Sequence, residues 1–87
     1  MLHKLNKGDT LISYVIGKTE PCSTNTIKKI EEVGERKYKV WFMEPGKLTS
    51  RTNEKEILKD KYGNEYYILE HFGDSPGNWG YIIQRIS

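Results

Sequence analysis

The sequence contains no alanine, and this absence is the first guide to its fold. Alanine has the highest helix propensity of the amino acids, so a helical bundle of this length would normally contain many copies. The chain instead has nine Ile, six Tyr, six Thr and three Val among its 87 residues. These β-branched and aromatic residues fit the pleated surface of a sheet. The composition therefore predicts a mainly β protein, and the length allows one compact domain over residues 1–87.

The chain has too few cysteines, histidines and long apolar runs for several classes of protein. One cysteine cannot form the disulfide framework of a small secreted domain. Structural zinc needs four ligands at paired spacing, which one Cys and two distant His cannot supply. No apolar run exceeds four residues, whereas a membrane span needs about 20. We therefore expect a cytoplasmic protein with no membrane association, metal or other cofactor.

Charge of either sign is not in large excess. The net charge is +2, from 14 Lys and Arg against 12 Asp and Glu. Residues 1–45 carry eight basic and six acidic residues, and residues 46–87 carry six of each. Nucleic-acid-binding domains usually concentrate basic residues on one face. The overall charge permits nucleic-acid binding but does not require it.

Alternation of apolar and polar residues predicts five or six short strands separated by turn residues. Residues 65–72 place Tyr66, Ile68 and Phe72 on one side and Tyr67, Leu69 and His71 on the other. The predicted strands are residues 10–17, 37–43, 48–52, 57–61, 65–72 and 81–86.

Two segments between these strands are ambiguous. Ile27, Ile30 and Val33 recur every three residues, which suits either a short helix or a strand with a bulge. We prefer the strand, because residues 34–36 form a hairpin-like turn into residues 37–43. Residues 53–56 (Asn-Glu-Lys-Glu) resemble a capping box for one helical turn. The better supported alternative there is a hairpin of residues 57–61 and 65–72.

Proline marks two predicted interruptions of the sheet. Residues 18–24 are predicted to be a loop, because Pro21 lacks the N–H group that a strand ladder uses. Residues 44–47 (Glu-Pro-Gly-Lys) read as a tight turn with proline at its second position.

The strand rhythm and the opening Lys-Gly-Asp-Thr-Leu of residues 7–11 resemble SH3-like small barrels at the level of fold. The expected architecture is a small single-domain SH3-like barrel or meander of five to six short antiparallel strands, with at most one short helix. Barrels of this type host many functions, so the resemblance implies no activity.

No catalytic set is recognisable. Cys22 with His71 or His3 is the only nucleophile-and-base combination, and nothing near Cys22 in the sequence would activate a thiol. Some toxin endoribonucleases use small SH3-like barrels with Arg, Glu, Asp or His around a groove, so a small nuclease is a minor alternative. We predict that the protein is not an enzyme. The residues of those types, in no matching spacing, are Arg36, Arg51, Arg85, Glu70 and His71.

Recognition residues are easier to find. Trp41 shares a strand face with Lys39 and follows Arg36 and Lys37, and aromatic rings interleaved with cations can stack bases and hold phosphates. The alternative is a tryptophan covering a second sheet, flanked by lysine stems. Trp79, in the Gly- and Pro-rich segment 73–80, either tucks onto the barrel or contacts a partner. The candidate ligand-binding residues are Trp41, Trp79, Lys39, Lys37, Arg36, Tyr14 and Tyr81.

Two functions follow as hypotheses. The first is a non-enzymatic binding module for nucleic acid or a nucleotide. The second is a protein-interaction module, such as a small phage-encoded inhibitor that sequesters or blocks a host factor through residues 48–52 or 73–80. The bias of 11 Lys over three Arg is typical of AT-rich coding, which low-GC bacteria and their phages share. We also expect a homo-oligomer, because so short a chain buries little of its own surface.

Overall fold

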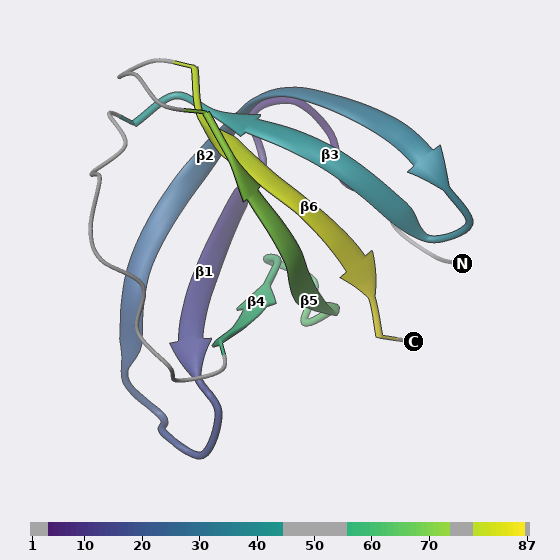
Figure 1. Ribbon diagram of the computed structural model, residues 1–87. Coiled ribbons are helices and arrows are strands. Elements are labelled where there is room, and N and C mark those ends of the chain that lie inside the picture. Colours follow the sequence, from purple (N-terminus) through teal and green to yellow (C-terminus); the bar gives the residue numbers. More distant parts are fainter. Residues whose placement is uncertain (1–3, 45–55, 74–77, 87) are drawn as a thin grey trace.

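Six antiparallel strands form a closed barrel in the computed structural model, which describes residues 4–44, 56–73 and 78–86. In barrel order the strands are β1-β2-β3-β6-β5-β4, and β4 pairs back onto β1 (Figure 1). The described residues contain no helix, and so none that could span a membrane. The predicted mainly β barrel is confirmed, and its order differs from that of a simple meander. The strands are β1 (Thr10–Val15), β2 (Pro21–Gly34), β3 (Lys37–Phe42), β4 (Glu56–Lys59), β5 (Glu65–Phe72) and β6 (Gly80–Arg85).

The ambiguous segment 25–33 is part of β2, so the preferred hairpin is confirmed. Ile27 lies opposite Phe42 and Ile30 opposite Val40, with a register shift that leaves Lys28 as an extra residue. The bulge explains why apolar residues recur every three positions on a strand whose normal period is two.

The predicted loop 18–24 is too long. β2 begins at Pro21, which lies opposite Tyr14, and a register shift next to this pair leaves Cys22 of β2 as an extra residue. Proline is tolerated as the first residue of a strand, where its missing N–H interrupts no interior ladder bond. The prediction that Pro21 keeps this segment out of the sheet is therefore wrong, and the connection is limited to residues 16–20.

The β4–β5 hairpin is confirmed, but the predicted faces of β5 need a correction. A register shift between Ile68 and Glu70 leaves an extra residue in β5. Beyond it, Phe72 lies on the outer wall instead of sharing a face with Tyr66 and Ile68. Glu56 is the first residue of β4 rather than part of a helical turn. The predicted turn at 44–47, beyond Glu44, and the predicted strand 48–52 lie outside the described residues.

Side chains from all six strands and the N-terminal segment fill the barrel interior. Burying a large apolar side chain stabilises a fold by about 1.5–3 kcal/mol, so this set is the main source of stability. The buried apolar residues are Leu5, Leu11, Ile27, Val40, Phe42, Leu58, Tyr66, Tyr81 and Ile83.

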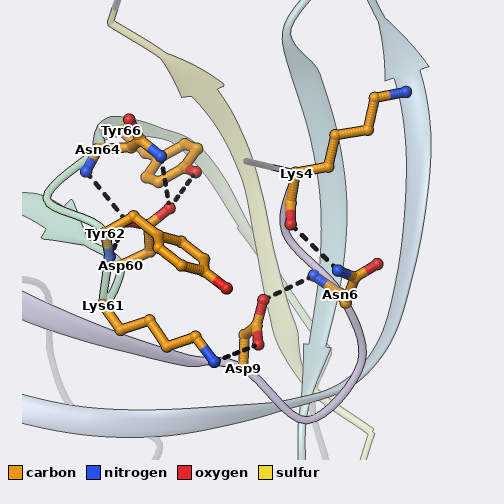
Figure 2. Close-up of polar contacts among 8 residues, drawn as sticks. All are labelled: Lys4, Asn6, Asp9, Asp60, Lys61, Tyr62, Asn64 and Tyr66. Atoms are coloured by element: carbon orange, nitrogen blue, oxygen red, sulfur yellow. Dashed lines mark hydrogen bonds and ion pairs between the residues drawn. The ribbon is translucent and has the colours of Figure 1, made fainter. Parts of the chain in front are cut away.

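A buried polar network holds the β4–β5 turn (Figure 2). The carboxylate of Asp60 accepts hydrogen bonds from the Tyr66 hydroxyl at 2.8 Å and from the Asn64 side-chain amide at 3.0 Å. It also accepts the backbone N–H groups of Tyr62 and Asn64. Burial alone would raise the pKa of Asp60, but these donors outweigh it and hold the pKa below the ordinary value of 3.8. The guanidinium group of Arg85 donates to the side-chain oxygen Oδ1 of Asn64 at 2.8 Å and extends the network into β6.

Candidate nucleic-acid interface

Four strands bring aromatic and basic side chains together on the outside of the barrel. Trp41 of β3 lies opposite Lys29 of β2 on one side and opposite Gly80 of β6 on the other. Phe72 of β5 lies opposite Gly80 on the far side of β6, so the four residues form one row across the wall. The neighbouring row contains Lys39 of β3. Cross-strand neighbours in such rows are close enough for their side chains to touch.

The distances define a compact group of two rings and two ammonium groups. The Trp41 and Phe72 rings meet edge to face, with centroids 5.4 Å apart and planes at 70°. The Nζ of Lys29 lies 4.6 Å from the centre of the Trp41 ring, and that of Lys39 lies 5.1 Å from it. Lys39 also lies 4.9 Å from the centre of the Phe72 ring. We call Lys29, Lys39, Trp41 and Phe72 the outer aromatic cluster.

Gly80 makes this cluster possible. A Cβ at this position would overlap the carbonyl oxygen of Val40 and lie 2.8 Å from Cζ of Phe72. The Phe72 ring thus packs over bare backbone, next to Trp41. An aromatic ring covering a glycine on a neighbouring strand is a known way of stabilising a sheet.

The charges in the cluster are only lightly engaged. Lys29 forms an ion pair with Glu31 at 3.7 Å, and both side chains are more than half exposed. Exposed pairs of this kind contribute about 0–1 kcal/mol, so either partner can be exchanged at small cost. Lys37 lies two residues before Lys39 on β3 and adds a third cation to the same strand face.

Arg36 is placed differently from the three lysines. It occupies the β2–β3 turn with a positive φ of 56°. Its backbone carbonyl accepts hydrogen bonds from the Arg85 N–H at 2.8 Å and from Nε2 of Gln84 at 3.1 Å. Arg36 therefore joins the β2–β3 turn to β6 through its backbone, and its exposed side chain lies at the hairpin tip.

Trp79 and Tyr81 lie on the inner side of the wall. The centre of the Trp79 ring is 4.9 Å from that of Phe42 and 5.5 Å from that of Tyr81. The indole N–H of Trp79 donates to the backbone carbonyl of Glu44. Trp79 is therefore tucked against the barrel in this structure. Tyr81 is buried, and its ring also contacts His71.

Glu44 ties this end of the barrel together. Its carboxylate accepts the backbone N–H of Thr26 at 2.6 Å and the Thr26 hydroxyl at 2.8 Å. Burial alone would raise the pKa of Glu44, but these hydrogen bonds outweigh it and lower the pKa from the ordinary value of 4.5. These hydrogen bonds join the end of β3 to β2. They also hold in place the Glu44 carbonyl that accepts the hydrogen bond from Trp79.

Tyr14 lies apart from both tryptophans. It faces outward from β1, and the Nζ of Lys59 lies 5.2 Å from its ring centre. The structure thus brings Trp41, Lys39 and Lys37 to one surface and leaves the other candidates elsewhere: Arg36, Trp79, Tyr81 and Tyr14.

Sequence reasoning did not identify Lys29 and Phe72 as members of the cluster. Lys29 lies opposite Trp41 only because of the bulge at Lys28, and Phe72 reaches the outer face only because of the shift after Ile68. The three-residue spacing of apolar residues in β2 was a signal for the first bulge. The second bulge left no comparable pattern.

The described residues contain no group of three or more His, Cys, Asp or Glu side chains placed to hold a metal ion. Of the segments considered for contact with a partner protein, residues 48–52 and residues 74–77 of the segment 73–80 lie outside the described residues. The outer aromatic cluster therefore offers the most concrete chemistry in the described chain: flat rings and exchangeable cations. Comparisons of the chain with protein-family models, curated protein sequences and solved structures found no match.

Proposed function

We propose that this protein is a binding module for single-stranded nucleic acid and that the outer aromatic cluster is its contact surface. One observation carries the proposal: two lysine ammonium groups lie over the Trp41 ring, 4.6 Å and 5.1 Å from its centre, and a second ring lies beside it. Single-strand binders combine aromatic rings that stack bases with cations that follow the phosphates.

A single strand suits the site better than a free nucleotide. The cluster lies on the outer wall of a barrel, which curves away from a ligand, whereas small-molecule sites are concave and bury most of their ligand. A single strand can cross a convex sheet face and place successive bases on neighbouring rings. Bases in a duplex are stacked on each other and cannot reach Trp41 in this way.

Binding would exchange contacts that the free protein already makes. A base stacking on Trp41 displaces a lysine ammonium group from the ring face, and the released ammonium group contacts a phosphate. Lys29 also exchanges its exposed carboxylate partner, Glu31, for the phosphate. Stacking is worth about 1–3 kcal/mol per base, which exceeds the value of an exposed cation–π contact of about 0.5–1 kcal/mol.

Tryptophan fluorescence tests the proposal directly. A Trp79→Phe variant keeps an aromatic ring against the core and leaves Trp41 as the only tryptophan. Single-stranded DNA and RNA oligonucleotides should quench this emission, and the affinity should fall as salt rises, with a slope of about −0.7 per phosphate contact. A duplex of the same sequence should quench more weakly.

A matched pair of charge removals assigns the effect to the cluster. Lys39→Gln should weaken binding and reduce the salt slope by about 0.7. Lys61→Gln removes the same charge from the β4–β5 turn, where Lys61 pairs with Asp9 at 3.7 Å (Figure 2). This control should change neither the affinity nor the salt slope. The absence of quenching by any single strand, or equal losses in the two variants, would contradict the proposal.

A further inference from the structure

A second outer surface lies across the barrel from β3, on β1, β4 and β5. Tyr14 of β1 lies opposite Ile57 of β4, which lies opposite Tyr67 of β5, so the three form one continuous row. Ile16 and Leu69 flank this row. Tyr67, Leu69 and Ile16 are each about half exposed, at 47%, 51% and 48%. We call these five residues the outer apolar face.

This face has a hollow and a projection side by side. The hollow has a volume of about 370 Å³ and is lined by Tyr14, Ile57 and the loop that follows β1. The projection consists of the exposed side chains of Tyr67 and Leu69 on the neighbouring strand β5. A surface that carries both shapes can match a rotated copy of itself.

The charged side chains around these two shapes differ. Two lysines, Lys18 and Lys59, border the hollow together with one glutamate, Glu65. Glu65 and Glu70 lie on β5, on either side of Tyr67 and Leu69. Lys59 and Glu65 pair within the chain at 3.6 Å, but their side chains are 44% and 42% exposed. A pair this exposed is weak and can also engage charges on another molecule.

We propose that the outer apolar face binds a second copy of this chain as a two-fold symmetric dimer. The two-fold axis brings Tyr67 and Leu69 of each copy to the hollow of the other. The same rotation brings the glutamates beside each projection to the lysines beside the opposite hollow. Each contact of a projection with a hollow, and each contact of a glutamate with a lysine, therefore occurs twice, as a two-fold symmetric interface requires.

A dimer interface of ordinary size would cover a modest share of the surface of this chain. A standard interface buries roughly 800 Å² per partner. The whole chain exposes 5895 Å², so such an interface would take about one seventh of its surface. Lys29, Lys39 and Trp41 of the outer aromatic cluster lie on β2 and β3, outside this face, and Phe72 is the member nearest to it, three residues beyond Leu69 on β5.

Sedimentation velocity over a range of protein concentrations tests the dimer. We expect wild type to shift from monomer to dimer as concentration rises, and Tyr67→Glu to weaken this association at least tenfold. Tyr62→Glu is the matched control, because Tyr62 is 45% exposed but lies in the β4–β5 turn. A wild-type monomer at concentrations up to about 1 mM, an assembly larger than a dimer, or equal effects of the two variants would overturn the proposal.

A charge reversal keeps the test decisive if Tyr67→Glu fails to fold. Lys59→Glu places like charges across the interface and should also weaken the dimer at least tenfold. Adding Glu65→Lys restores opposite charges both within and between the chains and should recover the dimer. If the double variant stays as weakly associated as Lys59→Glu, the proposed arrangement is wrong. This outcome is independent of nucleic-acid binding, because sedimentation is measured without nucleic acid and neither Lys59 nor Glu65 belongs to the outer aromatic cluster.

Discussion

The two tryptophans lie on opposite sides of the same stretch of barrel wall. Trp41 lies opposite Gly80, and the carbonyl of Trp79, one residue earlier, accepts the N–H of Phe42, one residue after Trp41. The Trp41 ring nevertheless faces outward and has two lysine ammonium groups over it, whereas the Trp79 ring packs on the core. The side of the sheet, rather than the residue type, therefore decides whether a tryptophan ring packs in the core or faces a ligand.

The difference has a simple physical basis. The Trp79 ring packs on Phe42 and Tyr81, and its N–H has a fixed acceptor in Glu44. Removing this ring would remove its contacts with the core and the hydrogen bond to the Glu44 carbonyl. The Trp41 ring is covered mainly by flexible lysine side chains, which can move when a ligand arrives. One ring therefore stabilises the fold, and the other is available for recognition.

The largest expected effect comes from Gly80→Ala, because Gly80 lies opposite Trp41 and directly follows Trp79. The added Cβ overlaps the Val40 carbonyl and presses on Phe72, so β3 and β6 must separate. We expect a loss of about 3 kcal/mol or more in the free energy of unfolding, measured by urea denaturation. Gly34→Ala is the control, because its Cβ would make only an ordinary 3.4 Å contact with Lys37. Equal midpoints for the two variants would refute the close packing at Gly80.

Trp79→Ala should have the next largest effect. Deleting a buried tryptophan typically costs about 3–5 kcal/mol, and the partial exposure of Trp79 places it near the lower end, at about 3 kcal/mol. Trp79→Phe keeps the contacts with Phe42 and Tyr81 and should cost about 1 kcal/mol, mostly from the lost hydrogen bond. Thermal and urea unfolding measure both values. If Trp79→Ala lowers the free energy of unfolding by less than about 1 kcal/mol, Trp79 does not stabilise the fold more than Trp41 does.

The carboxylate of Glu44 should make the Trp79 end of the barrel sensitive to acid. Its folded-state pKa lies below the ordinary value of 4.5, so its stabilisation is present above that pH and is lost as the pH falls through the folded-state pKa. After discounting for partial exposure, we expect about 1 kcal/mol.

The measurement for Glu44 is a difference between two proteins. Wild type should have a higher free energy of unfolding than Glu44→Gln at pH 7, and this difference should become smaller below pH 4.5. Asp60 has a lowered pKa as well and remains in both proteins, so its contribution cancels. If the difference in unfolding free energy stays constant until both proteins unfold in acid, the charge of Glu44 does not stabilise the fold.

Trp41→Ala should have the smallest effect on folding. Its ring lies on the outer wall, so we expect a loss of about 1 kcal/mol or less, mainly from the contact with Phe72. The same variant should lose most of its affinity for single-stranded oligonucleotides, measured by anisotropy of a labelled strand. A variant that unfolds as readily as Trp79→Ala, or binds like wild type, would make Trp41 a structural residue.

Much of the barrel was predictable because its strands are short and strongly patterned. Residues 10–15 and 37–42 alternate clearly, and the hairpin of β4 and β5 has turn residues at Tyr62–Asn64. The bulges were harder. Bulges at Lys28 and after Ile68 each shift the register by one residue, and a one-residue shift reverses the face of every side chain that follows. For this reason the sequence identified Trp41 and Lys39 as candidates but missed Lys29 and Phe72.

The sequence by itself determined the class of the protein. Alanine is absent and β-branched and aromatic residues are abundant, so the local propensities and the period of two both favour strands. Only the tertiary structure decided which side of the wall each aromatic ring occupies. That choice depends on how β3, β6 and β5 align around Gly80, and strand alignment is set by long-range pairing and bulges that no local pattern records.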